Sequence, residues 1–244
     1  MALKTILNYS PNFNSKKRNL KQIKFIIFHY TGMKKESGAI NKLTNIQSEV
    51  SCHYFIKDNG EIIKIVPDLF IAWHAGKSSW KNYKSLNKNS IGIEISNPGH
   101  EFNYKNFSNK QVSSILKLSK FLIKKYSIQS KNILGHSDIA PDRKKDPGDK
   151  FPWKYLAKNK IGIWHNLKNK NLRNNKNHKI NNTSKKIFLN NLFKIGYSRK
   201  IPKNINKNKY EVFIIKAFQR RYRNELINGK IDKECLLISN NLIK

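Results

Sequence analysis

Two histidines and one aspartate occupy positions that are typical of metal ligands. His29 ends an apolar stretch, KQIKFIIFH, and His136 follows a second short extended stretch, NILG. Open sheets commonly place ligand-binding groups at the carboxyl ends of such strands. Asp146 precedes Pro147, so its backbone is held extended and its carboxylate is a rigid candidate ligand. The three side chains together suggest a metal site.

Two imidazoles and one carboxylate form the ligand set of a hydrolytic zinc site. They leave the fourth tetrahedral position open, which distinguishes catalytic zinc sites from structural ones. Zinc lowers the pKa of a bound water from about 15.7 toward about 7, which provides hydroxide at neutral pH. Histidines and aspartates this far apart in sequence also occur by chance. Spacing alone therefore leaves ordinary hydrogen-bonded side chains as the alternative.

The strands that must position these ligands are visible as apolar runs. Residues 21–29 predict a buried strand, since five of the eight positions before the histidine are apolar and no turn residue interrupts them. Residues 52–57 and 61–66 predict a hairpin, because Asn59-Gly60 readily supplies the positive φ that a tight turn requires. These segments predict neighbouring strands of one sheet.

The remaining signals in the first two thirds of the chain complete an α/β pattern. Residues 90–96, SIGIEIS, alternate isoleucine with other residues, so Glu94 points away from the apolar row. Ser108 and Gln111 predict a capping box at the start of a long amphipathic helix. Strands interleaved with helices predict that residues 1–165 form a catalytic α/β domain with a mixed central sheet flanked by helices.

The C-terminal third has a different composition. Residues 166–186 are rich in Asn and Lys, lack acidic residues and lack periodicity, which predicts a basic linker. Residues 187–244 carry three apolar patterns at helical spacing, which predict a small three-helix domain. Gly196 is expected to end the first of these helices and Asp232 to cap the third.

The chain is strongly basic, with 49 Lys and Arg against 15 Asp and Glu and a formal net charge of +34. Such a field attracts polyanions, among which nucleic acid, acidic membrane and anionic cell wall all qualify. A compositional bias of the source genome toward Lys, Asn and Ile explains the charge equally well. No zinc-finger, helix-turn-helix or RNA-binding signature is present, so we expect no specific nucleic-acid partner.

The first residues, MALKTILNYSPNF, lack the sustained apolar core of a signal peptide, and FIIF is far too short to span a membrane. We therefore expect a cytoplasmic monomer without a membrane span, with the periplasm or cell envelope as the alternative compartment. The two cysteines, Cys52 and Cys235, fall in different predicted domains. We expect them to be buried free thiols rather than a disulfide.

Six segments in the first 160 residues occur in an order that resembles the type 2 family of zinc-dependent N-acetylmuramoyl-L-alanine amidases, which includes the peptidoglycan recognition proteins. They are FHYTG (28–32), SCHYFI (51–56), AWHAG (72–76), IGIEIS (91–96), GHSDIAPDRKKDPG (135–148) and FPW (151–153). The resemblance implies one zinc ion per chain at His29, His136 and Asp146. It also implies hydrolysis of the amide between the lactyl group of muramic acid and L-alanine, in peptidoglycan or in soluble muropeptides.

The AmpD/AmiD-like branch of this family adds a glutamate on a central strand and a lysine two residues before the aspartate. Here these are Glu94 and Lys144. A carboxylate beside the activated water can accept its proton and pass one to the leaving amine. An ammonium beside the metal can stabilise the oxyanion that develops. Both residues are therefore candidate catalytic residues.

Other residues in the matched motifs have weaker assignments. Phage members of the family carry a tyrosine where this chain has Cys52, and a nucleophilic role for this cysteine lacks an activating base. His53 and His74 are expected to be structural, with ring nitrogens bonded to backbone or to neighbours of the ligands. Three residues are candidate substrate contacts, although an aromatic residue in such a loop is as often core: Trp73, Ala75 and Arg143.

The C-terminal motifs IGY (195–197), AFQRRYR (217–223) and NGKID (228–232) resemble the three-helix peptidoglycan-binding domain of AmiD-like amidases. Such a module would tether the catalytic domain to polymeric wall. A cationic bundle without a ligand is the alternative. The competing function for the whole chain is a non-catalytic peptidoglycan-recognition or polyanion-binding protein, which has no need for the complete set of ligands and catalytic residues.

Overall fold

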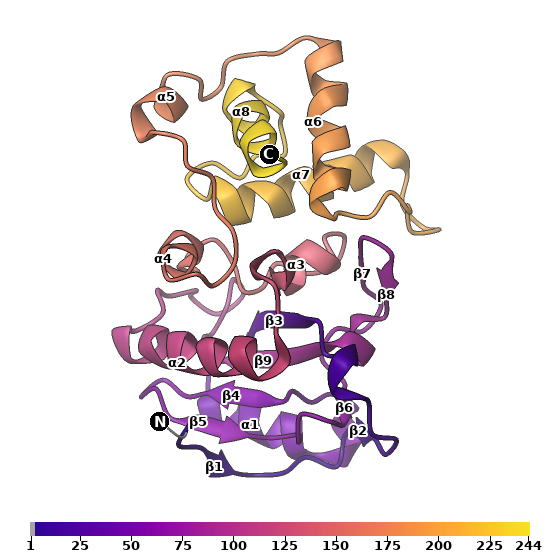
Figure 1. Ribbon diagram of the computed structural model, residues 1–244, viewed down its shortest axis with the longest axis vertical. Helices are drawn as coiled ribbons and strands as arrows, with labels where there is room; N and C mark the ends of the chain where they lie inside the picture. The colour runs from indigo at the N-terminus through magenta and orange to yellow at the C-terminus, as the bar shows by residue number, and fades with distance from the viewer. Residues whose placement is uncertain (1–2) are drawn as a thin grey trace.

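A six-stranded mixed sheet forms the centre of the computed structural model, which describes residues 3–244 (Figure 1). Met1 and Ala2, the first residues of the predicted catalytic domain, lie outside the described residues. The strand order is β1-β5-β4-β9-β3-β10. The strands are β1 (Ile6–Leu7), β3 (Phe25–Tyr30), β4 (Tyr54–Ile56), β5 (Ile62–Lys64), β9 (Ser90–Ile95) and β10 (Ile133–Gly135). Two short antiparallel pairs lie outside this sheet: β2 (Phe13–Asn14) with β6 (Ile71–Ala72), and β7 (Ser79–Trp80) with β8 (Tyr83–Lys84).

The pairing within the central sheet confirms the predicted mixed α/β fold. Strands β3, β4, β9 and β10 form parallel pairs, whereas β4 and β5 are the antiparallel arms of the predicted hairpin. Gly60 in the hairpin turn has φ +86°, and a Cβ there would lie 2.9 Å from the backbone oxygen of Lys110. Both the turn and the close approach of the helix therefore require glycine.

Eight α-helices surround the sheet within the described residues. Their bounds are α1 (Glu36–Thr44), α2 (Asn109–Tyr126), α3 (His136–Ile139), α4 (Trp153–Lys158), α5 (Asn169–Arg173), α6 (Asn182–Ile195), α7 (Lys207–Tyr222) and α8 (Lys233–Leu242). Short 3-10 turns lie at Leu20–Gln22, Ile46–Ser48, Leu86–Asn89 and Ser130–Asn132. Among the helices of residues 3–244, none has both the length and the apolar character that a membrane span requires.

The long helix α2 covers one face of the sheet. The side chains of Ser108 and Gln111 form the predicted capping box at its first turn. Its apolar stripe packs against the isoleucines of β9 in a single core cluster, which also includes Trp153 of α4. The apolar residues of α2 recur at the helical period and those of β9 at every second residue. Each element therefore presents one apolar face, and these two faces pack together.

The opposite face of the sheet carries the side chains that alternate with those isoleucines. Near one edge this face is covered by α1, through Ala39 and Leu43 packed against Phe55. Near the other edge it is covered by α3, on which α7 packs in turn. Between α1 and α3 lies a cleft lined by the carboxyl ends of β3 and β9 and by His136, and this cleft holds the candidate site.

The C-terminal helices share a hydrophobic core with the sheet. One buried cluster joins Phe25, Ile27 and Leu134 of the strands to Phe188 of α6 and Phe218 of α7. Figure 1 shows helices α5 to α8 gathered at the end of the molecule beyond α3 and α4. The three predicted helices are present as α6, α7 and α8; α7 packs against α3 and α4, and a continuous apolar cluster joins all three helices to the sheet.

Residues 166–186, predicted to be a linker, contain regular structure. Helix α5 lies within them, and the buried side chain of Leu172 joins the shared core. Helix α6 begins at Asn182, where Asn181 accepts a hydrogen bond from the backbone of Ser184. The basic Asn- and Lys-rich composition thus coexists with local helix and with one buried anchor. The division of the chain into domains 1–165, 166–186 and 187–244 remains a prediction.

Candidate active site

His29 and Glu94 lie side by side on adjacent parallel strands. In the register of β3 and β9, His29 pairs with Glu94 and Ile27 pairs with Gly92. Paired residues of neighbouring strands point to the same face of a sheet. Both functional side chains therefore point to the face opposite α2, as the alternation in SIGIEIS predicts for Glu94.

His136 and Asp146 reach the same place from the end of β10. Leu134 shares the face of Ile27 in the register of β10 with β3, and His136 follows two residues later as the first residue of α3. The backbone N–H of Ser137 donates to the carbonyl of Asp146 at 2.8 Å. This hydrogen bond closes the loop after α3 and brings the aspartate back beside the histidine.

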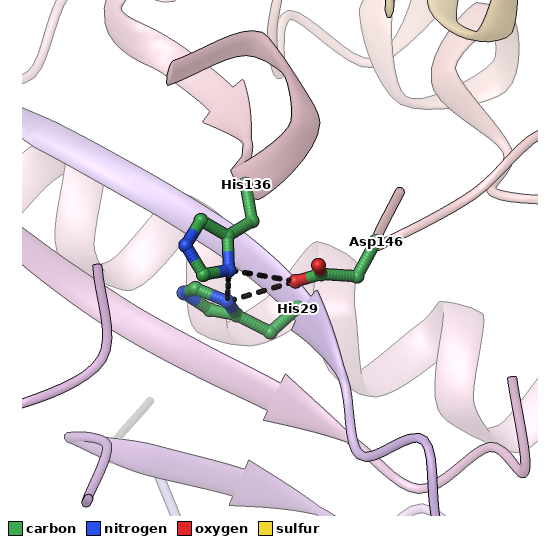
Figure 2. A group of neighbouring side chains, drawn as sticks. All are labelled: His29, His136 and Asp146. Carbon is green, nitrogen blue, oxygen red and sulfur yellow. Dashed lines mark hydrogen bonds and ion pairs between the residues drawn. The ribbon is translucent and has the colours of Figure 1, made fainter. Parts of the chain in front are cut away.

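The three predicted ligands converge on one point, as Figure 2 shows. The Nδ1 atoms of His29 and His136 lie 3.0 Å apart. The Oδ2 atom of Asp146 lies 3.0 Å from the first nitrogen and 3.1 Å from the second. All three residues are buried, and within residues 3–244 theirs is the one group of such side chains arranged to hold a metal ion.

Hydrogen bonds behind His29 determine which of its nitrogens carries the proton. The hydroxyl of Ser90 donates to the carbonyl of Leu86 at 2.6 Å, so Ser90 Oγ acts as acceptor toward His74 Nε2 at 3.1 Å. His74 Nδ1 is then unprotonated and accepts from His29 Nε2 at 3.0 Å. The Nδ1 atom of His29 is left with a free lone pair that faces the cluster.

His136 is oriented in the same way by a backbone carbonyl. Its Nε2 atom lies 3.2 Å from the carbonyl oxygen of Ala75, which can only accept, so this nitrogen carries the proton of the neutral ring. Its Nδ1 is therefore also a lone pair. Two imidazole lone pairs and a carboxylate oxygen about 3 Å apart repel one another unless a cation lies between them. The donor set fits a metal ion.

The electrostatics of the cluster keep its members in their ligating forms. Burial and the neighbouring His136 together lower the pKa of His29 to about 4, against the opposing effect of Asp146. Burial alone would raise the pKa of Asp146, but its interactions with both histidines outweigh burial and hold this pKa below its ordinary value. Near neutral pH, His29 is neutral and Asp146 is ionised.

The position of His74 depends on a glycine in the central strand. A Cβ at Gly92 would lie 2.4 Å from the His74 ring, so only glycine leaves room for the ring above β9. The side-chain oxygen of Asn87 accepts from the backbone N–H groups of His74 and Ala75 at 3.1 and 2.6 Å. His74 lies in the matched segment AWHAG and was expected beside the ligands, whereas Ser90 and Asn87 lie outside the matched segments and carry no signal in the sequence.

Glu94 is half-buried at the edge of the cluster, and its Oε2 atom is buried. Its Oε2 atom makes no hydrogen bond within the described residues. Burial raises the pKa of Glu94 well above its ordinary value; the charge of Asp146 raises it further, whereas Lys144 lowers it. A desolvated carboxyl oxygen that no group within residues 3–244 engages, beside a candidate cation site, is suited to proton transfer.

The cluster forms the floor of a cleft of about 360 Å³. Glu94 and Trp73 line the cleft, together with the half-buried Lys144 from the loop before Asp146. The amide N–H of Lys144 donates to the carbonyl of Ala140 at 3.0 Å, which anchors that loop on the end of α3. The structure thus brings the candidate ligands and both candidate catalytic residues to one cavity.

The three candidate substrate contacts lie in different surroundings. Trp73 lines the cleft, and its indole N–H donates to Asn14 at 2.7 Å. Ala75 is fully buried, and its carbonyl accepts from Arg143 Nη2 at 2.6 Å as well as from His136. Arg143 lines the cleft while its guanidinium also binds the carbonyl of Lys77. Substrate contact by these residues remains a prediction.

Cys52 and His53 lie behind the cluster rather than in it. The thiol of Cys52 is buried, which raises its pKa well above the ordinary value, and the charge of Glu94 adds to this effect. His53 accepts the backbone N–H of Gly92 at 3.0 Å through Nδ1. Both cysteines of the chain are buried free thiols, as predicted.

Comparison with known proteins identifies relatives for nearly the whole chain. A family model described as N-acetylmuramoyl-L-alanine amidase matches residues 19–149. The N-acetylmuramoyl-L-alanine amidase AmiD of Escherichia coli (strain K12) is 34% identical over 237 residues, covering 91% of this chain and 83% of the relative. The match therefore includes the C-terminal helices.

Two solved structures share the fold. One is the complex of the AmiD amidase from E. coli with the substrate anhydro-N-acetylmuramic acid-L-Ala-D-gamma-Glu-L-Lys, with a TM-score of 0.79 and 33% identity over 91% of this chain and 89% of that one. The other is AmpDh3 from Pseudomonas aeruginosa, with a TM-score of 0.78 and 28% identity over 95% of both chains.

The convergence of three acceptors predicts one metal ion per chain in the purified protein. His29→Ala or Asp146→Ala leaves only two of the three protein ligands, so each variant should retain well under about a tenth of the metal. Elemental analysis of folded protein measures this. His178→Ala, which removes an exposed histidine elsewhere, is the control and should keep full occupancy. Wild-type metal content in both ligand variants would contradict the site.

Proposed function

Because the chain belongs to the N-acetylmuramoyl-L-alanine amidase family, we propose that it hydrolyses the amide between the lactyl group of N-acetylmuramic or anhydromuramic acid and L-alanine. Its substrates are peptidoglycan or the muropeptides released from it. The observation that carries this proposal is the buried group of His29, His136 and Asp146 beside Glu94 at the floor of a cleft.

We infer that the resident metal is one zinc ion. Ligand atoms about 2.0–2.1 Å from a tetrahedral zinc lie roughly 3.3 Å apart, close to the separations of 3.0 and 3.1 Å between the three acceptors. Two neutral imidazoles favour zinc over magnesium or calcium, which prefer oxygen ligands. A zinc ion held there would supply Lewis acidity for activating water and polarising the scissile carbonyl.

Glu94 is proposed to carry the proton during hydrolysis. Its carboxyl group lies on the same sheet face as His29, and its Oε2 has no protein partner to displace. A carboxylate in this position can accept the proton of the attacking water and deliver it to the nitrogen of the departing L-alanine. A raised pKa suits the second half of that cycle, because the group holds the proton until the amine leaves.

Lys144 is proposed to stabilise negative charge on the carbonyl oxygen of the tetrahedral intermediate. It lines the cleft, is half-buried and stands two residues from Asp146. An ammonium group fixed by its loop is placed before the charge develops, so little reorganisation accompanies the reaction. This arrangement favours an enzyme over the alternative of a non-catalytic recognition protein, which needs neither Glu94 nor Lys144.

Binding to polymeric wall is a second part of the proposal. A cavity of about 360 Å³ lies at the seam of α4 and α7, lined by Trp164, by the half-exposed Tyr155 and by several cationic side chains. Helix α7 contributes Arg221 to it, and the turn that follows α7 contributes Asn224. Aromatic faces with adjacent polar groups suit sugar rings, and cations suit the carboxylates of stem peptides. This favours residues 187–244 as part of a wall-binding module. Compartment and oligomeric state remain predictions.

The products of the reaction test the proposed function directly. Incubation with anhydro-N-acetylmuramyl tripeptide should release the free peptide with an N-terminal L-alanine and the intact sugar acid, because the proposed bond joins them. Mass spectrometry identifies both products, and parallel digestion of sacculi distinguishes polymer from soluble substrate. Cleavage at a glycosidic bond or within the peptide would contradict the amidase assignment, as would no cleavage of either substrate.

Glu94 and Lys144 should be separable from the ligands by kinetics. Glu94→Ala should keep its metal yet lose about 10²–10⁴ in turnover, since proton transfer is removed. Lys144→Ala should lower kcat with little change in KM, the pattern of an interaction made only in the transition state. Metal content and turnover are measured on the same preparations.

The control for this pair is Lys131→Ala, which removes an exposed lysine at a distance from the cleft and should leave both readings unchanged. Near wild-type turnover in metal-loaded Glu94→Ala would refute its role in proton transfer. A rise in KM at constant kcat in Lys144→Ala would show substrate binding instead of oxyanion stabilisation.

Wall binding through the α4 and α7 seam predicts a loss in cosedimentation with insoluble peptidoglycan. Tyr155→Ala removes an aromatic side chain that is 50% exposed, and should weaken binding to sacculi by roughly 3- to 10-fold while hydrolysis of soluble muropeptide is retained. Tyr9→Ala is the matched control, because Tyr9 is 55% exposed and lies outside the cavity. Equal sedimentation of both variants would exclude this seam as the binding surface.

A further inference from the structure

Arg221 of α7 reaches from the C-terminal helices into the catalytic part of the molecule. The side chain is buried, with a relative exposure of 3%. Its Nη1 atom donates to Asp138 Oδ2 at 2.5 Å, and its Nη2 donates to the carbonyl of Ile133 at 2.9 Å. The guanidinium also stacks over the ring of Trp153, 4.2 Å from the centroid. One planar cation therefore makes three kinds of contact with distant parts of the chain.

The two hydrogen-bonded groups lie on either side of His136. Ile133 begins β10, and Asp138 lies in the first turn of α3. Asp138 Oδ2 also accepts the backbone N–H of Gly135 at 2.8 Å, which fixes the residue that precedes His136. A single guanidinium thus holds both ends of a six-residue segment that contains one candidate ligand.

A second residue of the C-terminal region supports the same carboxylate. The hydroxyl of Tyr197, which follows α6, donates to Asp138 Oδ1 at 2.9 Å. Both oxygens of Asp138 are thereby occupied, one by Tyr197 and the other by Arg221 and Gly135. A buried carboxylate with this many donors is fixed in orientation, whereas one deprived of its cation is strongly destabilised.

The segment that Arg221 holds is also in contact with Asp146. A Cβ at Gly135 would lie 2.6 Å from the ring of Pro147, so the end of β10 packs directly against the loop that carries Asp146. The backbone of Ser137 donates to the carbonyl of Asp146 at 2.8 Å. A shift of β10 or of the first turn of α3 would therefore move two of the three candidate ligands together.

We propose that Arg221 and Tyr197 are positioning residues for the candidate metal site and act through Asp138 on His136. The C-terminal helices complete the active site in addition to any contact with the wall. This inference rests on the proposed metal site but not on amide hydrolysis. Ligands must be held within about 0.5 Å of their working geometry, and neighbours that orient them commonly affect metal affinity by about 10- to 100-fold.

The chain offers a matched control for Arg221. Arg223 lies two residues further on, is buried to 4% relative exposure and forms a comparably close ion pair with Asp232. That pair joins the end of α7 to the cap of α8, and the side-chain hydrogen bonds of Arg223 go to Asp232 and Asn228, which both lie outside α3. Loss of either arginine leaves a buried carboxylate without its cation, so both losses should lower thermal stability. Only the loss of Arg221 disturbs the segment of His136.

The experiment measures zinc affinity in the full-length protein by competition with a chromophoric chelator. Arg221→Met should bind zinc about 10- to 100-fold more weakly than the wild type. Arg223→Met should bind zinc like the wild type while melting at a lower temperature. Equal zinc affinity in Arg221→Met and in the wild type would overturn the proposal, as would equal losses in both arginine variants.

A milder pair of variants covers the case in which Arg221→Met fails to fold. Tyr197→Phe removes one hydroxyl and should weaken zinc binding by roughly 2- to 10-fold, the range of one lost hydrogen bond. Tyr210→Phe removes a hydroxyl that donates to the carbonyl of Ser198 and should leave zinc affinity unchanged. Unchanged affinity in Tyr197→Phe would overturn the proposal. A wild type that binds zinc but cleaves no muropeptide would contradict only the proposed function.

Discussion

The arrangement of the molecule depends on three lone-pair donors held about 3 Å apart in a buried pocket. Brought together without a cation, the two histidine nitrogens and the carboxylate oxygen would repel one another, and none can turn toward water. Each must therefore be fixed by contacts on its far side. Behind His29 this contact is a relay of hydrogen bonds that runs from Ser90 through His74. Behind His136 it is a backbone carbonyl, and behind Asp146 it is a loop closed by a backbone hydrogen bond.

Parallel strands bring His29, Glu94 and His136 together because the carboxyl ends of such strands lie at the same edge of the sheet. The register of β3 with β9 sets His29 beside Glu94, and the register of β3 with β10 leads to His136. The space for the relay is created by Gly92, where any larger residue would collide with His74. The positions of His29 and Glu94, and the space for the side chains that support them, thus follow from one face of one sheet.

The far end of the chain is part of this structure rather than an appendage to it. The sheet and helices α6 to α8 share an apolar core, and Arg221 adds a buried polar link between them. Apolar contact is non-directional and brings the two parts together, whereas the ion pair to Asp138 fixes their orientation. The same seam carries an aromatic and cationic cavity. Placement of the helices therefore determines both the shape of this cavity and the support of Asp138.

The sequence by itself determined the local features of this protein. The strand alternation around Glu94, the hairpin at Gly60, the capping box at Ser108 and the cap at Asp232 each arise from neighbours within a few residues, and all are present. It also named His29, His136 and Asp146, because strand ends and a proline mark them.

Tertiary structure alone decided what supports these ligands. The relay through His74 and Ser90 and the clamp by Arg221 join residues 16 to 88 positions apart. Likewise, the buried side chain of Leu172 anchors part of a segment of linker-like composition to the shared apolar core. Such pairings are fixed by packing and register, which no local pattern of residue types encodes.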